Sequence, residues 1–277
     1  MANSSYSYPH NFTFETSFDQ WAVKRWTEDH WVSLCTTTGS LYVFLVFAGR
    51  AAMEGRPPFQ LRGALTAWSA ALATFSVLGL SRTLPELLHT LATGGLQESV
   101  CNPNYLETNT VSAFWTVAFI FSKLPELGDT AFIVLRKQKL IFLHWYHHLT
   151  VMCYGFFTLQ AFSSTGRWFM VMNYFVHSLM YSYYTLKALR VKIPSNIAMA
   201  ITGLQLVQMV IGSAINVLAF LYKRNGASHL LTTHHPILLP PISLLAHPPP
   251  GKDCSVTDSN LAVSLLMYAS YFVLFAR

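Results

Sequence analysis

The sequence predicts an all-α membrane protein, a polytopic bundle of seven transmembrane helices whose seventh helix is short or truncated. Two observations support this prediction. Of the 277 residues, 52% are hydrophobic and only 11% are charged, whereas about 25% of the residues in a soluble protein are charged. Apolar segments that approach the roughly 20 residues of a membrane span recur along the whole chain. They lie at residues 32–50, 63–81, 112–135, 140–162, 168–189, 197–221 and 261–276.

Residues 1–31 precede the first predicted span and form an N-terminal segment that we expect on the lumenal side. This segment lacks the basic start and continuous apolar core of a signal peptide, so the first span is expected to act as the signal. Sequons at Asn3 and Asn11 are glycosylation acceptors only if this end faces a lumen. Each short turn that would then be cytosolic is basic, which favours the same orientation. The net charge of +6 follows from this topology, and we expect no nucleic-acid partner.

After a six-span core at residues 32–221, residues 222–260 form a Pro-rich insert that is lumenal in this topology. Its proline clusters are incompatible with a continuous helix. Cys101 and Cys254 both fall in lumenal segments, where an oxidising compartment would let them form a disulfide. The last region, residues 261–277, reaches only about 24 Å at helical rise, short of a hydrocarbon core of roughly 30 Å. We therefore expect a truncated seventh span.

The third predicted span contains three ionisable residues, which are costly at membrane depth and usually mark function. Lys123, Glu126 and Asp129 follow one another at steps of three. Lys123 and Glu126 are spaced to pair as i, i+3 neighbours. Pro125 and Gly128 are expected to loosen the helix and free carbonyl groups toward a cavity.

The next three predicted spans each carry a polar face. His144, His147 and His148 stand at positions i, i+3 and i+4 of the fourth span, which places them on one helical face. A single His or Gln between membrane helices more often stabilises helix packing than takes part in chemistry. At about 1.5 Å per residue, however, the polar groups of four spans fall at one level in the cytosolic half of the membrane. The polar stripes of the fifth and sixth spans are Asn173, His177, Met180, Tyr181 and Tyr184, and Thr202, Gln205 and Gln208.

Three classes of function fit this arrangement. A metal-dependent lipid desaturase or hydroxylase would use histidine boxes around two irons, although such boxes need more histidines than this chain has in its spans. A seven-span transporter would move protons through His and Asp, but its polar groups are expected to cross the full membrane. The third class is an acyl-transfer enzyme in which a histidine imidazole would be the nucleophile that carries the acyl group. Cys153 lies about 140° around the helix from His148 and points away from the polar face, so a histidine is the better candidate nucleophile.

Four blocks resemble, in order and spacing, the signature blocks of the fatty acid elongases of the endoplasmic reticulum. The resemblance spans roughly Asp29 to Tyr222, and the sequence around the histidine box is most similar to the elongase 6-like branch, with the elongase 3-like branch as neighbour. The blocks are Lys123–Thr130 (KLPELGDT), His144–His148 (HWYHH), Asn173–Tyr184 (NYFVHSLMYSYY) and Thr202–Gln208 (TGLQLVQ).

This resemblance implies a membrane condensing enzyme, a 3-oxoacyl-CoA synthase that joins a long-chain acyl-CoA with malonyl-CoA and releases CO2 and CoA. No tightly bound cofactor or metal is implied. The N-terminus would be lumenal and the active site open to the cytosol. The implied partners are the bilayer, the reductases and dehydratase of the elongation cycle, and further copies of this chain or other elongases.

The resemblance also suggests roles for single residues. His147 would attack the acyl thioester, and His177 would activate or orient this chemistry. His144 and His148 would shape the site and exchange protons. Lys123, held by Glu126 and Asp129, would contact CoA or the malonyl carboxylate. The remaining substrate-binding residues are expected to be Asn173, Tyr181, Tyr184, Gln205 and Gln208.

Overall fold

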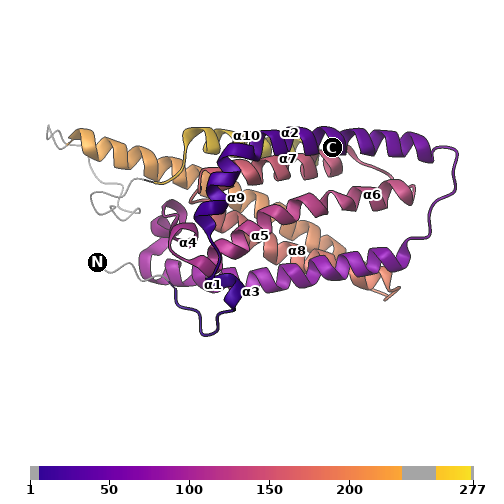
Figure 1. Ribbon diagram of the computed structural model, residues 1–277, viewed down its shortest axis with the longest axis horizontal. Helices are drawn as coiled ribbons and strands as arrows, with labels where there is room; N and C mark the ends of the chain where they lie inside the picture. The colour runs from indigo at the N-terminus through magenta and orange to yellow at the C-terminus, as the bar shows by residue number, and fades with distance from the viewer. Residues whose placement is uncertain (1–5, 233–253, 276–277) are drawn as a thin grey trace.

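The computed structural model describes residues 6–232 and 254–275, and all regular secondary structure in these ranges is helical. Long helices run side by side along the longest axis of the molecule (Figure 1). Within the described ranges, three helices are long and apolar enough to cross a membrane by length and composition, namely α2 (Gln20–Met53), α3 (Arg62–Cys101) and α9 (Ser195–Thr232). The all-α class is confirmed, and the seven-span topology stays a prediction.

The other helices complete the bundle and its connections. The short α1 and α4 lie at one end of the bundle, and the loop between α2 and α3 lies at the other (Figure 1). Backbone bonds also tie this second end together, because Phe59 N donates to Leu135 O at 3.0 Å. The bounds are α1 (Thr13–Thr16), α4 (Asn104–Glu107), α5 (Thr110–Glu126), α6 (Gly128–Leu135), α7 (Phe142–Gln160), α8 (Gly166–Ala188) and α10 (Asp258–Phe275).

The first long helix begins earlier than the sequence predicts. Part of the segment 1–31 is helical, because α2 already starts at Gln20. The Asp19 carboxylate accepts a hydrogen bond from Ala22 N at 2.8 Å, which satisfies one of the free N–H groups at a helix start. Of the two predicted sequons, Asn3 lies outside the described residues, and Asn11 is exposed just before α1.

The third predicted span is two helices. The break lies at Leu127, between α5 and α6. Pro125 has no N–H to continue the helical ladder, and Leu127 N instead donates to Leu124 O, three residues back, at 3.2 Å. Asp129 therefore follows the break and does not continue the face of α5.

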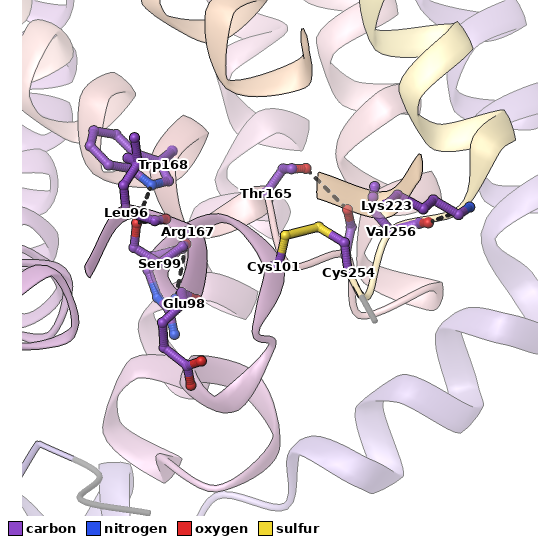
Figure 2. The surroundings of a disulfide bond; sticks show 11 residues. Leu96, Glu98, Ser99, Cys101, Thr165, Arg167, Trp168, Lys223, Cys254 and Val256 are labelled. Atoms are coloured by element: carbon purple, nitrogen blue, oxygen red, sulfur yellow. Dashed lines mark hydrogen bonds between the residues drawn. A yellow bond between two sulfur atoms is a disulfide. The ribbon is translucent and has the colours of Figure 1, made fainter. Parts of the chain in front are cut away.

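Cys101 and Cys254 form a disulfide that ties the end of α3 to the segment before α10 (Figure 2). Two neighbouring contacts hold the same segment: Ser255 N donates to Cys101 O at 2.9 Å, and Lys223 Nζ donates to Val256 O at 2.9 Å. The predicted insert at residues 222–260 is helical in its first part, where α9 continues. Residues 233–253 of this insert lie outside the described residues.

Helices α3 and α8 have the most extensive contact in the bundle. A glycine permits their close approach, because a Cβ added at Gly79 would lie 2.2 Å from Cζ of Tyr174. The Tyr174 hydroxyl then donates to Trp115 O at 2.9 Å. Close packing at this crossing fixes the helix that carries His177.

A buried carboxylate anchors the N-terminal segment to the α1 end of the bundle. Glu15 has no exposed surface and accepts hydrogen bonds from Arg82 Nε at 2.9 Å and from Trp115 Nε1 at 2.7 Å. Burial raises the pKa of Glu15, but the Arg82 and Trp115 bonds stabilise its charged form more strongly, so the net pKa lies below its ordinary value. Tyr8 completes this N-terminal clasp by donating its hydroxyl to Arg82 O at 2.7 Å.

Candidate functional site

A cavity of about 350 Å³ lies among α5, α7, α8, α9 and α10, and apolar side chains dominate its lining. Nearly every side chain that the sequence predicts for the site lines this one cavity. Glu126 is the exception, since it lies behind Lys123. The predicted residues on the cavity wall are His144, His147, His148, His177, Lys123, Asp129, Asn173, Tyr181, Tyr184, Gln205 and Gln208.

The two ends of the cavity differ in exposure. Toward the α1 end, buried Tyr105 donates its hydroxyl to Ser163 O at 2.8 Å. Tyr154, which lines the cavity, donates its hydroxyl to Asn260 Oδ1 of α10 at 3.1 Å. At the other end Ile141 and Tyr184 are 49% and 45% exposed. The cavity therefore reaches the surface only at the end nearest the histidines of α7, as far as the described residues show.

Lys123 and Glu126 form the ion pair that their spacing predicts. Lys123 Nζ donates to the two carboxylate oxygens of Glu126 at 2.8 and 3.0 Å. Ser122 Oγ donates to the same carboxylate at 2.9 Å, and Lys123 also donates to Asn173 Oδ1 at 3.2 Å. Both charges are buried, with 3% and 4% exposure. A cation and an anion that share several hydrogen bonds are tolerated at this depth, whereas either charge alone is not.

The contact between Lys123 and Asn173 determines which ring nitrogen of His177 carries the proton. Lys123 is a donor only, so the Asn173 atom that faces it is the carbonyl oxygen, and the amide nitrogen faces His177. Asn173 Nδ2 then donates to His177 Nε2 at 3.2 Å. The proton of a neutral His177 imidazole is thereby left on Nδ1, which lies 4.0 Å from Glu126 Oε2. Glu126 is thus hydrogen-bonded to Lys123 and lies near the protonated nitrogen of His177 without a hydrogen bond to it.

The three histidines of α7 differ in their contacts. His144 Nε2 lies 3.1 Å from Thr130 Oγ1, which in turn lies 2.7 Å from the hydroxyl of Tyr42. The His144 and His148 rings are 4.6 Å apart between centroids, so the two are adjacent on one face as predicted. No hydrogen bond from another described residue reaches either ring nitrogen of His147, which packs against the rings of His148 and Tyr271. Its nitrogens are available to a ligand in the cavity.

Asp129 does not hold Lys123, contrary to the expectation from sequence. Its Oδ1 accepts from Trp68 Nε1 and its Oδ2 from the Tyr181 hydroxyl, each at 2.6 Å. Six residues of helix already place Asp129 about 120° around the axis from Lys123, and the start of α6 lies between the two residues. Tyr181 accordingly donates its hydroxyl proton to a protein group and not toward the middle of the cavity.

The sixth predicted span places its two glutamines on the cavity wall but not its threonine. Gln205 Nε2 donates to Met180 Sδ at 3.3 Å, and Gln208 also lines the cavity. Thr202 is exposed and is absent from the lining. The sequence did not predict three tyrosines that line the cavity, Tyr154, Tyr268 and Tyr271. It also did not predict the residues behind the lining that hydrogen-bond to it directly or through one another. These are Tyr42, Trp68, Thr130, Thr150 and Asn260.

Metal binding needs several His, Cys, Asp or Glu side chains that converge on one point. Across residues 6–232 and 254–275, no three such side chains come close enough together to hold an ion. The nearby acids are engaged elsewhere, since Glu126 binds Lys123 and Asp129 binds Trp68 and Tyr181. The described geometry therefore favours acid–base or nucleophilic chemistry by the histidines.

Known proteins resemble the chain over nearly its whole length. The profile of the family described as "ELO: GNS1/SUR4 family" matches residues 26–277. Very long chain fatty acid elongase 6 of Drosophila melanogaster is 48% identical over 271 residues, covering 98% of this chain and 78% of the relative. Very long chain fatty acid elongase 6 of Gallus gallus is 41% identical, covering 96% and 90%. Very long chain fatty acid elongase 3 of Homo sapiens is 37% identical, covering 96% and 87%. The predicted similarity to elongases 6 and 3 is confirmed.

Proposed function

The chain belongs to the ELO family of very long chain fatty acid elongases, which are 3-oxoacyl-CoA synthases, and we propose that it performs this condensation in the cavity beside α7. The substrates are an acyl-CoA and malonyl-CoA, and the products are a 3-oxoacyl-CoA two carbons longer, CO2 and CoA. One observation supports this location above the others. His147 and His177, Lys123 and the glutamines of α9 all line a single, largely apolar cavity.

In the proposed reaction His147 is the nucleophile. A ring nitrogen of His147 forms a bond to the acyl carbon, the carbon–sulfur bond breaks, and the CoA thiolate takes the proton that the imidazole loses. Malonyl-CoA then loses CO2, and its enolate carbon attacks the acyl-imidazole to give the 3-oxoacyl-CoA. The His147 nitrogen leaves with the electron pair and takes a proton from solvent through His144 and His148. Imidazole is a known carrier of such covalent intermediates, and the ring nitrogens of His147, which have no hydrogen bond from another described residue, suit this role.

The neighbouring polar groups have distinct proposed roles. His177, with its proton on Nδ1, activates or orients the reacting groups, and its hydrogen bond with Asn173 fixes its ring. The carboxylate of Glu126 lies 4.0 Å from that Nδ1. Lys123 supplies positive charge for the malonyl carboxylate or CoA. His144 and His148 exchange protons. Hydrogen bonds to the thioester or enolate come from Asn173, Tyr184, Gln205 and Gln208, as charge develops on oxygen. Tyr181, whose hydroxyl proton is bonded to Asp129, contacts the substrate through its ring.

We propose a seven-span topology in the endoplasmic reticulum membrane, with a lumenal N-terminus and a cytosolic opening of the cavity. The disulfide at the end of α3 suits an oxidising compartment. Exposed Asn11 suits glycosylation on the same side, and Asn3 is proposed as a second acceptor. The exposed end of the cavity adjoins the opposite, basic loops, where soluble CoA esters would arrive. Working partners would be the reductases and dehydratase of the cycle, and other copies of this chain or other elongases.

The proposed nucleophile is tested by incubating purified protein with a long-chain acyl-CoA in the absence of malonyl-CoA. Intact-protein mass spectrometry should detect one acyl adduct, and peptide mapping should place it on His147. His147→Ala should abolish both the adduct and malonyl-CoA-dependent elongation. The matched control is His30→Ala, because His30 is exposed on α2 and absent from the cavity. An active wild-type enzyme that forms no adduct would exclude the covalent route.

A further inference from the structure

Helix α10 presents an aromatic side chain to the proposed nucleophile. Tyr271 lines the cavity and is 2% exposed. The centroid of its ring lies 4.9 Å from that of His147, with 54° between the ring planes. Aromatic and imidazole rings at this separation are in favourable contact. Helix α10, which corresponds to the seventh predicted span, therefore contributes to the site as well as to the packing of the bundle.

A directed hydrogen bond holds the Tyr271 ring in place. Thr150 donates its single hydroxyl proton to Tyr146 O at 2.8 Å, one helical turn back. Thr150 Oγ1 is consequently an acceptor toward Tyr271, whose hydroxyl lies 2.6 Å away. Because Thr150 stands three residues after His147 on α7, this bond ties Tyr271 to the turn of helix that carries the nucleophile.

His147 has few other restraints on its ring. Among the described residues, its aromatic contacts are with Tyr271 and with His148, whose centroid is 5.7 Å away, and no hydrogen bond reaches its ring nitrogens. A ring without hydrogen-bonded nitrogens keeps its orientation through packing alone. Attack on a thioester requires close alignment of the nitrogen with the acyl carbon, and misplacement by 1 Å costs about 100-fold in rate.

We infer that Tyr271 is a positioning residue that holds the His147 imidazole in the orientation required for acyl transfer, and that its bond to Thr150 sets its own position. This inference rests on the proposed role of His147 as nucleophile. Tyr271 touches the reacting histidine and transfers no proton or acyl group itself.

The experiment measures the rate of His147 acylation by acyl-CoA, together with kcat and KM for elongation, in detergent-solubilised full-length protein. Tyr271→Leu should slow acylation and kcat by about 10- to 100-fold, with little change in KM for acyl-CoA. Tyr271→Phe keeps the ring and loses the hydrogen bond, so the expected loss is about two- to tenfold. The matched control is Phe272→Leu, an aromatic residue outside the cavity lining that is 37% exposed.

Thr150→Val removes the same hydrogen bond from the other helix and provides a second route if Tyr271→Leu does not fold. Thr150→Val and Tyr271→Phe both remove the Thr150–Tyr271 bond, so the loss in the double variant should be smaller than the product of the two single losses. Each variant also removes a bond of its own, from Thr150 to Tyr146 O and from Tyr271 to His147 O. The inference would be overturned if Tyr271→Leu were acylated as fast as Phe272→Leu. A defect of Tyr271→Leu that is confined to KM, or fully additive losses in the double variant, would also overturn it. Absence of any wild-type adduct would instead overturn the proposed nucleophile, so the two failures are distinguishable.

Discussion

Removal of one partner of the buried Lys123–Glu126 pair should destabilise the bundle strongly. Glu126→Gln preserves shape but leaves a lysine that is 3% exposed with no counter-charge. The change also weakens the hydrogen bonds at 2.8 and 3.0 Å between the two side chains. Breaking a buried pair in this way costs about 3–5 kcal/mol. With an unfolding entropy of about 2.1 cal/mol/K per residue, the melting temperature of 277 residues should fall by roughly 5–9 °C.

Thermal unfolding in detergent, followed by the loss of monodisperse protein, measures this difference. The matched control is Glu28→Gln, which breaks the partly exposed Lys24–Glu28 pair on α2. Such surface pairs contribute about 0.3–0.5 kcal/mol, so the control should melt within about 1 °C of wild type. The apolar double variant Lys123→Met with Glu126→Leu should recover stability because no unpaired charge remains.

The double variant should nevertheless stay inactive, since the proposed reaction uses the charge of Lys123 and the orientation of His177. Equal melting temperatures for Glu126→Gln and Glu28→Gln would refute the stability reasoning. An active double variant would show that the pair serves packing only and has no part in the reaction.

Three further predictions concern the rest of the bundle. The pKa of Glu15 is lower in the folded protein than in the unfolded chain, where it is about 4.3. The charged carboxylate therefore stabilises the fold fully above that pH, and this stabilisation is lost as the pH falls below it. The difference in melting temperature between wild type and Glu15→Gln should be constant near neutral pH and should shrink in acid. Gly79→Ala, which places a methyl against the Tyr174 ring, should cost about 1–3 kcal/mol, whereas Gly63→Ala, with open space around it, should cost nothing in the same melting assay. Cys254→Ser should cost about 2–4 kcal/mol, and reducing agent should lower the melting temperature of wild type but not of this variant.

Much of the candidate site follows from helical periodicity. The i, i+3, i+4 spacing of the histidines predicted one face of α7, and the step of three predicted the Lys123–Glu126 pair. Both predictions concern residues within one uninterrupted helix, where a constant rotation per residue relates position to direction. The rotation holds only while the helix continues.

The sequence could not predict contacts that depend on a helix break or on the packing of distant helices. Asp129 bonds to Trp68 of α3, and periodicity within one helix does not state which distant helix supplies that partner. Tyr271 belongs to a helix whose apolar composition predicts only packing in the bundle. Its contact with Thr150 depends on where α10 packs against α7. Tyr42 likewise lies in an apolar segment that predicts only helix packing, whereas in the structure its hydroxyl is hydrogen-bonded to Thr130.

The disulfide has a consequence for how the chain tolerates variation. Cys254 is bonded to the end of α3, and Ser255 and Val256 are bonded to Cys101 O and Lys223, so the start of α10 is held independently of residues 233–253. Chain length between Thr232 and Cys254 is thereby uncoupled from the position of Tyr271. An epitope tag inserted there should leave elongation intact while the disulfide persists. Insertions or deletions in this segment should likewise leave the cavity unchanged.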